Sequence, residues 1–305
     1  MFSRLDAQAS QISNGRPRQL LHANLSTTSS AYEAEIPTSF QSFEAASDGL
    51  DYIRTCATQA IQSLPPPSPI ADPPLSTRAE IGLSLDLIRN SSAIRLTQWS
   101  SAFDGLLDDR KKFVSEADRR KIQFLKLDHI LTRVNFSIDF VRARSDEMIW
   151  DSYIQEFKAM LGYAKGLLNL TKMRGQPVFM LDTEVILPLF FVACKCRDGE
   201  LRRQAISLLR SQWRQEGVWN SFLAAKVAER VMQIEEGGIN GIEVIAADVL
   251  RCKRILGVVV KFDLQQRRAN LGYVKLKENG GIEYIKEWVR WASFGFHASI
   301  TREKV

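Results

Sequence analysis

The spacing of apolar residues predicts a chain built mainly of helices. From Phe40 onward, apolar residues recur at intervals of three, four and seven, which places them on one face of a helix. The first such stripe runs from Phe43 to Leu64 and ends at the proline-rich stretch 65–74, because proline lacks the amide donor and clashes with the preceding helical turn. We interpret this stretch as a stiff connector and a boundary between subdomains.

The first 38 residues lack this pattern. Only Phe2, Leu5 and Ile12 could form an apolar helical stripe there, and Ser, Thr, Asn and Gln are frequent after them. Such a composition is typical of a loop or a poorly ordered segment. We therefore expect a short helix and a poorly ordered segment over residues 1–38, followed by a helical domain over residues 39–305.

Start and stop signals delimit three helices in the first half of that domain. Thr77 and Glu80 have the spacing of a capping box, and Ser115 marks a second helix start. A third stripe ends near Gly175 and Pro177, which form an expected stop pair. The expected helices span about 81–106, 115–141 and 148–168.

Two further helices are expected on either side of residue 198. Thr183–Arg197 is the most apolar stretch of the chain, and Asp182 is its expected N-cap. Asp198 is then expected to cap a helix over Glu200–Gln212. The residues of this helix that we expect to point outward are Arg202, Arg203 and Arg210.

Asn220 or Ser221 is the expected cap of a helix over Phe222–Glu236, which a glycine pair ends, and one more helix is expected over 242–252. The spacing of the apolar residues then changes from a helical pattern to a strand pattern. Two β-branched-rich runs predict a β-hairpin over about 255–277, which must dock on the helices because a lone hairpin is marginally stable. A last helix is expected to help cover it, with Tyr284, Trp288 and Trp291.

These elements predict a mainly α fold: an irregular α-helical bundle or a solenoid-like domain with a small C-terminal β-hairpin. The chain has 305 residues, 45% of them hydrophobic and 25% charged, which excludes wholesale disorder. Its formal charge is +6.

The longest apolar run, Val185–Cys194, is half the roughly 20 residues of a transmembrane helix, and the amino terminus lacks a secretory pattern. No membrane association is expected.

The cysteines and histidines form no metal-binding or nucleophilic pattern. Four scattered cysteines fit a reducing compartment rather than a disulfide scaffold. Cys194 and Cys196 have one intervening residue, whereas zinc sites use pairs spaced by about two to four. We interpret them as buried structural residues. His129 lies in a helical stripe and is interpreted as satisfied or exposed. The remaining cysteines and histidines of the chain are Cys56, Cys252, His22 and His297.

Charged residues give no catalytic site either. The carboxylate pairs Asp108-Asp109 and Glu235-Glu236 lie at segment ends, and we interpret both as solvated. No glycine-rich phosphate loop or nucleophile elbow is present. We therefore assign no catalytic, cofactor-binding or metal-binding residue and expect no enzyme. Arginines are dense near Trp213, but acidic residues flank them, which does not favour a continuous nucleic-acid face. They are Arg197, Arg202, Arg203, Arg210 and Arg214.

Several ordered segments of the second half nevertheless form a recognisable pattern. They are Pro188–Asp198 with its Cys-Arg-Asp, Leu201–Arg210, Gln215–Asn220 with its Glu-Gly-Val-Trp, Ala224–Glu229, Val260–Leu264 with Arg267-Arg268, and Trp288–Trp291. Together they resemble the carboxy-terminal regulatory region of fungal binuclear zinc-cluster transcription factors, especially those found with secondary-metabolite genes. The likeness is densest over 183–292.

The resemblance implies a nuclear regulator of transcription whose partners are other transcription factors or coregulators, in a homo- or heterodimer. The family's DNA reader holds two zinc ions with six cysteines, whereas this chain has four and none in Cys-x-x-Cys spacing. No zinc cluster is expected, so the regulator would act through protein contacts or a small effector. The basic groups of the chain at 110–112 and 119–121 contain fewer Lys and Arg residues than a nuclear import signal usually has.

Three explanations of the missing zinc cluster stay open. The chain could come from a truncated gene model, be a paralogue that acts by pairing with an intact factor, or be a helical domain put to another use. The alternative from another functional class is a helical enzyme or small-molecule carrier in the same pathway, with a site assembled from distant residues.

Overall fold

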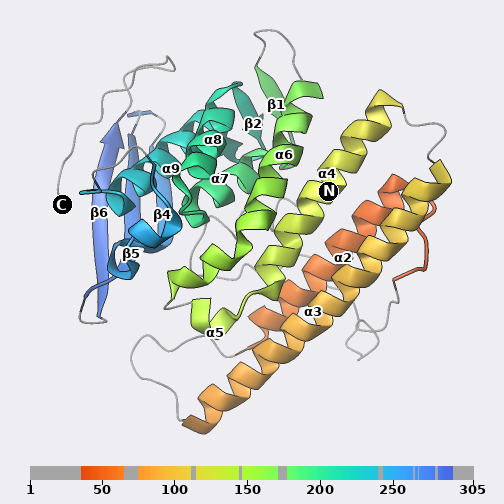
Figure 1. Cartoon of the computed structure of the whole chain (residues 1–305), viewed down its shortest axis with the longest axis horizontal. Helices are drawn as coiled ribbons and strands as arrows, with labels where there is room; N and C mark the ends of the chain where they lie inside the picture. The colour runs from red at the N-terminus through yellow and green to blue at the C-terminus, as the bar shows by residue number, and fades with distance from the viewer. Residues whose placement is uncertain are drawn as a thin grey trace. The chain divides into compact units, whose positions relative to one another are not determined.

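The computed structural model describes residues 36–64, 75–110, 115–143, 146–170, 177–239, 243–263, 265–266, 268–278 and 281–290. Over these residues the fold is mainly α with a small antiparallel sheet near the C-terminus, as predicted (Figure 1). The expectations for residues 1–35 and for the connector 65–74 lie outside the described residues.

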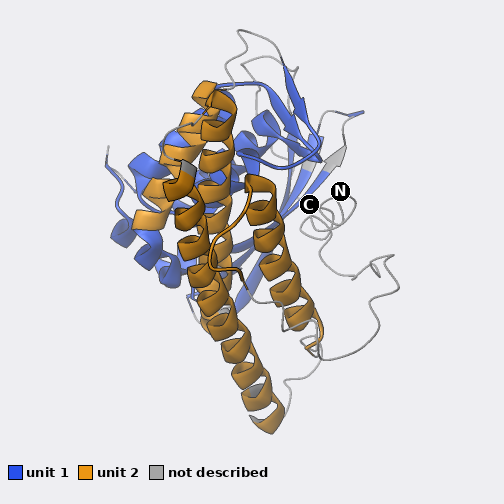
Figure 2. Cartoon of the chain, turned by 90° about the vertical axis from the view of Figure 1, so that its right-hand side faces the viewer, with its two compact units in different colours: residues 1–18, 144–154, 175–305 blue, residues 19–143, 155–174 orange. Residues whose placement is uncertain are grey.

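The chain divides into two compact units, coloured separately in Figure 2, a division that the single predicted domain over 39–305 did not include. Unit 2 contains most of the first half of the chain. Its elements are α2 (Phe43–Gln62), α3 (Leu75–Arg110), α4 (Glu116–Ser137), α5 (Phe140–Ala143) and all but the first residue of α6 (Ile154–Leu170). Because α2 and α3 belong to the same unit, the stretch between them is not a boundary between the compact units.

The apolar stripe of α2 organises the core of unit 2. Ser42 caps the helix, its side chain accepting a hydrogen bond from the Ala45 amide at 3.1 Å. The buried residues of α2 then face α3, which runs beside it (Figure 1). The indole of Trp99 in α3 donates to the carbonyl of Ala46 at 2.7 Å and stacks on Phe103, with 4.8 Å between ring centroids. The result is an aromatic and aliphatic core.

Two predicted helix starts in unit 2 have different outcomes. Helix α3 already begins at Leu75, so the capping box expected at Thr77 and Glu80 is wrong. The start at Ser115 is confirmed: its hydroxyl accepts from the Asp118 amide, and the Asp118 carboxylate accepts from the Ser115 amide in return. This reciprocal pair satisfies amides that the first turn of α4 leaves without helical partners.

Unit 1 contains short helices, 3-10 turns and two small sheets. Its elements are η2 (Glu147–Tyr153), β1 (Val178–Met180), α7 (Ile186–Lys195), α8 (Gly199–Arg210), β2 (Arg214–Glu216), β3 (Trp219–Asn220), α9 (Ser221–Glu235), η3 (Ala246–Asp248), η4 (Arg251–Lys253), β4 (Ile255–Asp263), β5 (Arg268–Leu276) and β6 (Ile282–Arg290).

The two caps predicted in the middle of unit 1 are confirmed. The Asp198 carboxylate accepts from the Leu201 amide at 3.0 Å and opens α8. The Asn220 side chain accepts from the amides of Phe222 and Leu223, both at 3.1 Å, and opens α9. Gly238 follows α9 with φ = 85°, a left-handed conformation that suits glycine. Local capping chemistry therefore set these boundaries.

The C-terminal region needs two corrections. The helix expected over 242–252 is wrong, because that stretch forms only the short 3-10 turns η3 and η4. The hairpin is confirmed as β4 and β5, but the last helix is wrong, because 282–290 pairs with β5 as a third antiparallel strand, β6. Glu287 interrupts the apolar alternation of β6 and is nonetheless buried, since Arg230 and Tyr273 bind its carboxylate. Trp291 lies outside the described residues.

Candidate functional site

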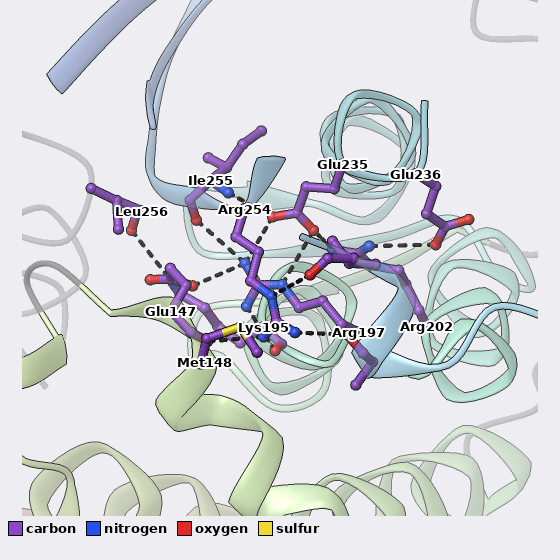
Figure 3. Close-up of polar contacts among 12 residues, drawn as sticks. Glu147, Met148, Lys195, Arg197, Arg202, Glu235, Glu236, Arg254, Ile255 and Leu256 are labelled. Carbon is purple, nitrogen blue, oxygen red and sulfur yellow. Dashed lines mark hydrogen bonds and ion pairs between the residues drawn. The ribbon is translucent and has the colours of Figure 1, made fainter. Parts of the chain in front are cut away.

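Charged side chains are buried at the centre of unit 1, where a core is usually apolar. Four arginines are at most 1% exposed, and three of them, Arg197, Arg202 and Arg214, pair with buried carboxylates. Most of them converge where the end of α7, the start of α8, the end of α9 and the start of β4 meet (Figure 3). The buried charged residues of this unit are Glu147, Glu184, Arg197, Arg202, Arg214, Glu216, Glu235, Arg254 and Glu287.

Glu235, the last residue of α9, is the centre of this network. Arg197 donates to its carboxylate through Nε at 3.2 Å and through Nη2 at 2.7 Å. Arg202 donates to the same carboxylate, and the Ile255 amide adds a hydrogen bond at 2.7 Å. Burial raises the pKa of this carboxyl, but the two guanidinium groups outweigh burial, so the pKa of Glu235 lies below its ordinary value of 4.5.

A second buried carboxylate joins the network from η2. Glu147 is 2% exposed and accepts from Lys195 Nζ at 2.7 Å, while its other oxygen lies 2.9 Å from Arg197 Nη2. The Lys195 ammonium also lies 5.3 Å from the centroid of the Trp150 ring. Arg197 therefore bridges two carboxylates that are far apart in the sequence.

Arg254 fastens η2 to the start of β4. Its guanidinium makes a two-pronged pair with Asp151, at 2.7 and 2.8 Å. Its remaining donors reach the carbonyls of Val249 at 3.0 Å and Ala246 at 2.7 Å. A planar guanidinium with this many fixed partners acts as a rigid connector rather than as a mobile charge.

A separate cluster in unit 1 caps α7. Glu216 in β2 accepts from the backbone amides of Glu184 at 2.7 Å, and of Val185 and Ile186 at 3.0 Å. Arg214 Nη1 bridges the carboxylates of Glu216 and Glu184, at 2.9 Å each. Burial outweighs these contacts and raises the pKa of Glu216. The expected cap at Asp182 is therefore wrong: the helix begins later, and its cap comes from a residue 30 positions further along the chain.

The network also corrects two interpretations of the charged residues. Glu235 is fully buried rather than solvated, and Arg202 is fully buried rather than outward-facing. Arg203 is exposed as predicted and pairs with Glu236 at 2.5 Å. A buried charge has the same residue type and helical spacing as a solvated one, so the sequence pattern alone could not find these partners.

The dense arginines consequently do not form one basic face. Arg197, Arg202 and Arg214 are buried in ion pairs, and Arg210 pairs with Glu229. Because their charge is matched inside the unit, these side chains are not placed to neutralise phosphates. What the network can do is hold four chain segments in one arrangement, since each buried charge needs its partner.

The cysteines occupy the positions expected of structural residues. Cys194 and Cys196 are buried, and burial raises the pKa of their thiols to about 12 and about 11. Thiols in this state are poor nucleophiles. Cys56 and Cys252 are half-buried. Within the ranges that the structure describes, no group of three or more His, Cys, Asp or Glu side chains could hold a metal ion.

Three other sequence candidates, His129, Asp108 and Asp109, belong to unit 2, whereas His22 and His297 lie outside the described residues. His129 stacks on Trp99 with 4.9 Å between ring centroids, and its Nε2 lies 3.1 Å from the Leu96 carbonyl. Burial lowers the pKa of His129, so its imidazole is a neutral part of the core. Asp108 and Asp109 are exposed, as predicted.

Comparison with protein-family models, with curated proteins and with solved structures gives no significant match. Among the helices that the structure describes, none combines the length and the apolar character needed to cross a membrane.

Proposed function

We propose that this chain is a non-enzymatic regulator of transcription, which acts in the nucleus on secondary-metabolite genes through contacts with other transcription factors or coregulators, or through a small effector. The observation that carries the proposal is the resemblance over 183–292. The residues that carry this resemblance include Arg197, Asp198, Arg202 and Glu216. Inside unit 1, Asp198 and Glu216 cap helices, and Arg197 and Arg202 bind the buried carboxylate of Glu235. These residues of the pattern therefore have a structural role in this chain.

Exposed apolar side chains support the protein-contact part of the proposal. They lie where β1 pairs with β2: the Val178 amide donates to the Trp213 carbonyl at 2.9 Å, and the Gly217 amide donates to the Met180 carbonyl at 2.8 Å. Exposed patches rich in aromatic residues are typical of protein interfaces. We call these residues the contact patch: Phe179, Leu181, Trp213 and Val218, which are 70%, 49%, 43% and 51% exposed.

Deleting the gene and measuring transcripts of the adjacent genes under inducing conditions tests the regulatory role. We expect those transcripts to change, and the wild-type chain to restore them. A double variant of the contact patch, Phe179→Ser with Trp213→Ser, should fold and fail to restore them. The matched control, Leu83→Ser with Leu87→Ser on the exposed face of α3, should restore them. Unchanged transcripts in the deletion strain would contradict the proposal.

The alternative class, a helical enzyme or carrier, has no specific support in the described residues. A cavity between α2 and α3, lined by Cys56 and Arg95 among others, has a volume of about 20 Å³. That space holds one water molecule rather than a metabolite. We therefore do not propose this class.

A further inference from the structure

The sheet β4–β5–β6 has two faces of different character. Successive residues of a strand point to opposite faces. On the inner face Leu271, Tyr273, Glu287 and Val289 are buried, and Glu287 pairs with Arg230 of α9 at 2.6 Å. The alternate register positions form what we call the outer face. They include Val259, Lys261, Arg268, Asn270, Gly272, Val274, Tyr284, Lys286 and Trp288.

Two aromatic rings stand on the outer face along one strand. Tyr284 is 73% exposed, and Trp288 follows four residues later on β6, about 14 Å along the strand. The guanidinium of Arg268 lies 4.1 Å from the centroid of the Trp288 ring. Aromatic rings beside a guanidinium offer both a stacking surface for a base and a charge for a phosphate.

The charge of the outer face is strongly positive. The outer-face positions whose side chains the structure describes carry the three cations Lys261, Arg268 and Lys286 and no carboxylate. Their net charge is +3. That is half of the formal charge of +6 of the whole chain. Such a face complements a polyanion.

A glycine at the centre of the outer face points to close approach by a ligand. Gly272 lies opposite Val259 on one side and Lys286 on the other. A Cβ atom built there would meet Val259 at ordinary contact distances, 3.8 Å from Cβ and 3.9 Å from the carbonyl oxygen. The positive-φ glycines of the described residues are Gly217 and Gly238, so neither space nor backbone conformation requires glycine at 272. A glycine inside a strand weakens it and often marks a bulge, a tight bend, or a site that a ligand or another backbone approaches closely. The register at Gly272 is regular on both sides, which argues against a bulge there.

We propose that the outer face binds single-stranded RNA. Bases would stack on Tyr284 and Trp288, and phosphates would pair with Lys261, Arg268 and Lys286. Stacking on side chains needs unpaired bases, which a duplex does not offer. The Asn270 amide lies in the row between Lys261 and Trp288 and can both donate to and accept from a ribose 2′-hydroxyl, which favours RNA over DNA as the occupant. This inference is independent of the proposed function.

Fluorescence anisotropy with the full chain and a labelled single-stranded oligouridine tests the proposal. With about three phosphates neutralised, the slope of log affinity against log salt should be about −2. Tyr284→Ala should weaken binding roughly 5- to 150-fold through the loss of one stacked base. Lys286→Ala should make the slope shallower by about 0.7.

Gly272→Val is the most informative variant, because a β-branched residue suits a strand. We expect it to retain or raise the unfolding temperature while it weakens RNA binding. The matched controls are on other elements: Phe179→Ala removes another exposed aromatic ring, on β1, and Lys158→Ala removes another exposed cation, on α6. Both should bind oligouridine as the wild type does.

Three results would overturn the proposal. One is the absence of oligouridine binding at low salt. Another is binding that Tyr284→Ala and Gly272→Val leave unchanged, with polyglutamate or duplex RNA binding equally well, which would assign the face to acidic partners in general. The third is tighter binding of oligothymidine than of oligouridine, which would assign the face to single-stranded DNA.

Discussion

The two units bury different kinds of side chain at their centres. In unit 2 the core joins aromatic and aliphatic residues such as Phe43, Leu50 and Trp99, and its buried polar residues in the described ranges are the uncharged Ser92 and Thr132. Unit 1 adds four fully buried arginines and their carboxylates to its apolar residues. An apolar core depends on volume and pattern, whereas a buried ion network depends on every partner being present. We therefore expect different substitutions and conditions to destabilise the two units.

The largest expected effect is the loss of the carboxylate at the centre of the network. Glu235→Ala leaves the guanidinium groups of Arg197 and Arg202 without their buried partner, and should destabilise unit 1 by about 3–5 kcal/mol. Hydrogen exchange with mass spectrometry measures each unit separately. The control is Glu229→Ala on the same helix, whose carboxylate is 22% exposed and pairs with Arg210. If both variants lose equal protection, the network is not what holds unit 1 together.

The matching change in unit 2 is a truncation in its apolar core. Leu50 is fully buried in α2, and Leu50→Ala should destabilise unit 2 by about 2–5 kcal/mol through lost burial and a residual cavity. Hydrogen exchange in α2 and α3 should rise, and added salt should not change the difference from the wild type. Leu87→Ala, at a 70% exposed position of α3, is the control. If added salt changed the loss of stability in Leu50→Ala, that loss would not come from the apolar core.

The units should also respond differently to mild acid. Burial lowers the pKa of His129 below 6.5, against the effects of Asp128 and Asp104, so protons bind the unfolded state first and unit 2 loses stability as pH falls below 6.5. In unit 1 the stabilisation from Glu235 is complete above 4.5 and is lost only as pH falls through its lowered pKa. Glu216, with a raised pKa, acts in the opposite direction, because acid relieves its buried charge.

Hydrogen exchange at several pH values between 6.5 and 4.5, corrected for the intrinsic exchange rates, measures how differently the two units respond to acid. We expect unit 2 alone to lose protection, and His129→Phe, which keeps a ring against Trp99, to remove that loss. An equal loss of protection in unit 1 would show that the pH response does not come from His129.

The smallest expected effect is at a solvent-exposed ion pair. Lys121 and Glu44 lie 2.6 Å apart, with side chains that are 48% and 66% exposed. Water and salt screen such a pair, so Lys121→Ala should leave the stability of unit 2 nearly unchanged. Hydrogen exchange of the amides of α2 and α4 measures the change in unit 2. A loss as large as that of Glu235→Ala would remove the distinction between buried and exposed charges.

The same contrast explains what could be predicted from the sequence. The apolar stripes located α2, α4 and α6, and local capping residues located the starts of α4, α8 and α9. These signals lie within a few residues of what they determine. The cap of α7 and the partners of Glu235 lie tens of residues away, so no local pattern contains them.

Strand β6 was missed for a related reason. Its inward positions include Glu283 and Glu287, which interrupt the alternation that identifies a half-buried strand. Glu287 is buried only because Arg230 and Tyr273 satisfy its carboxylate. The outer-face residues Tyr284 and Trp288 were consequently assigned to a helix, and the aromatic surface became visible only once their register with β5 was known.

The cap of α7 bears on the order in which this protein folds. The first amides of α7 find their acceptor in Glu216, which leaves the ribosome some 30 residues after Ile186, the first residue of the helix. During synthesis the first amides of α7 therefore lack this acceptor until β2 has emerged from the ribosome. The complete cap of α7 can therefore form only after β2 has been synthesised and has docked.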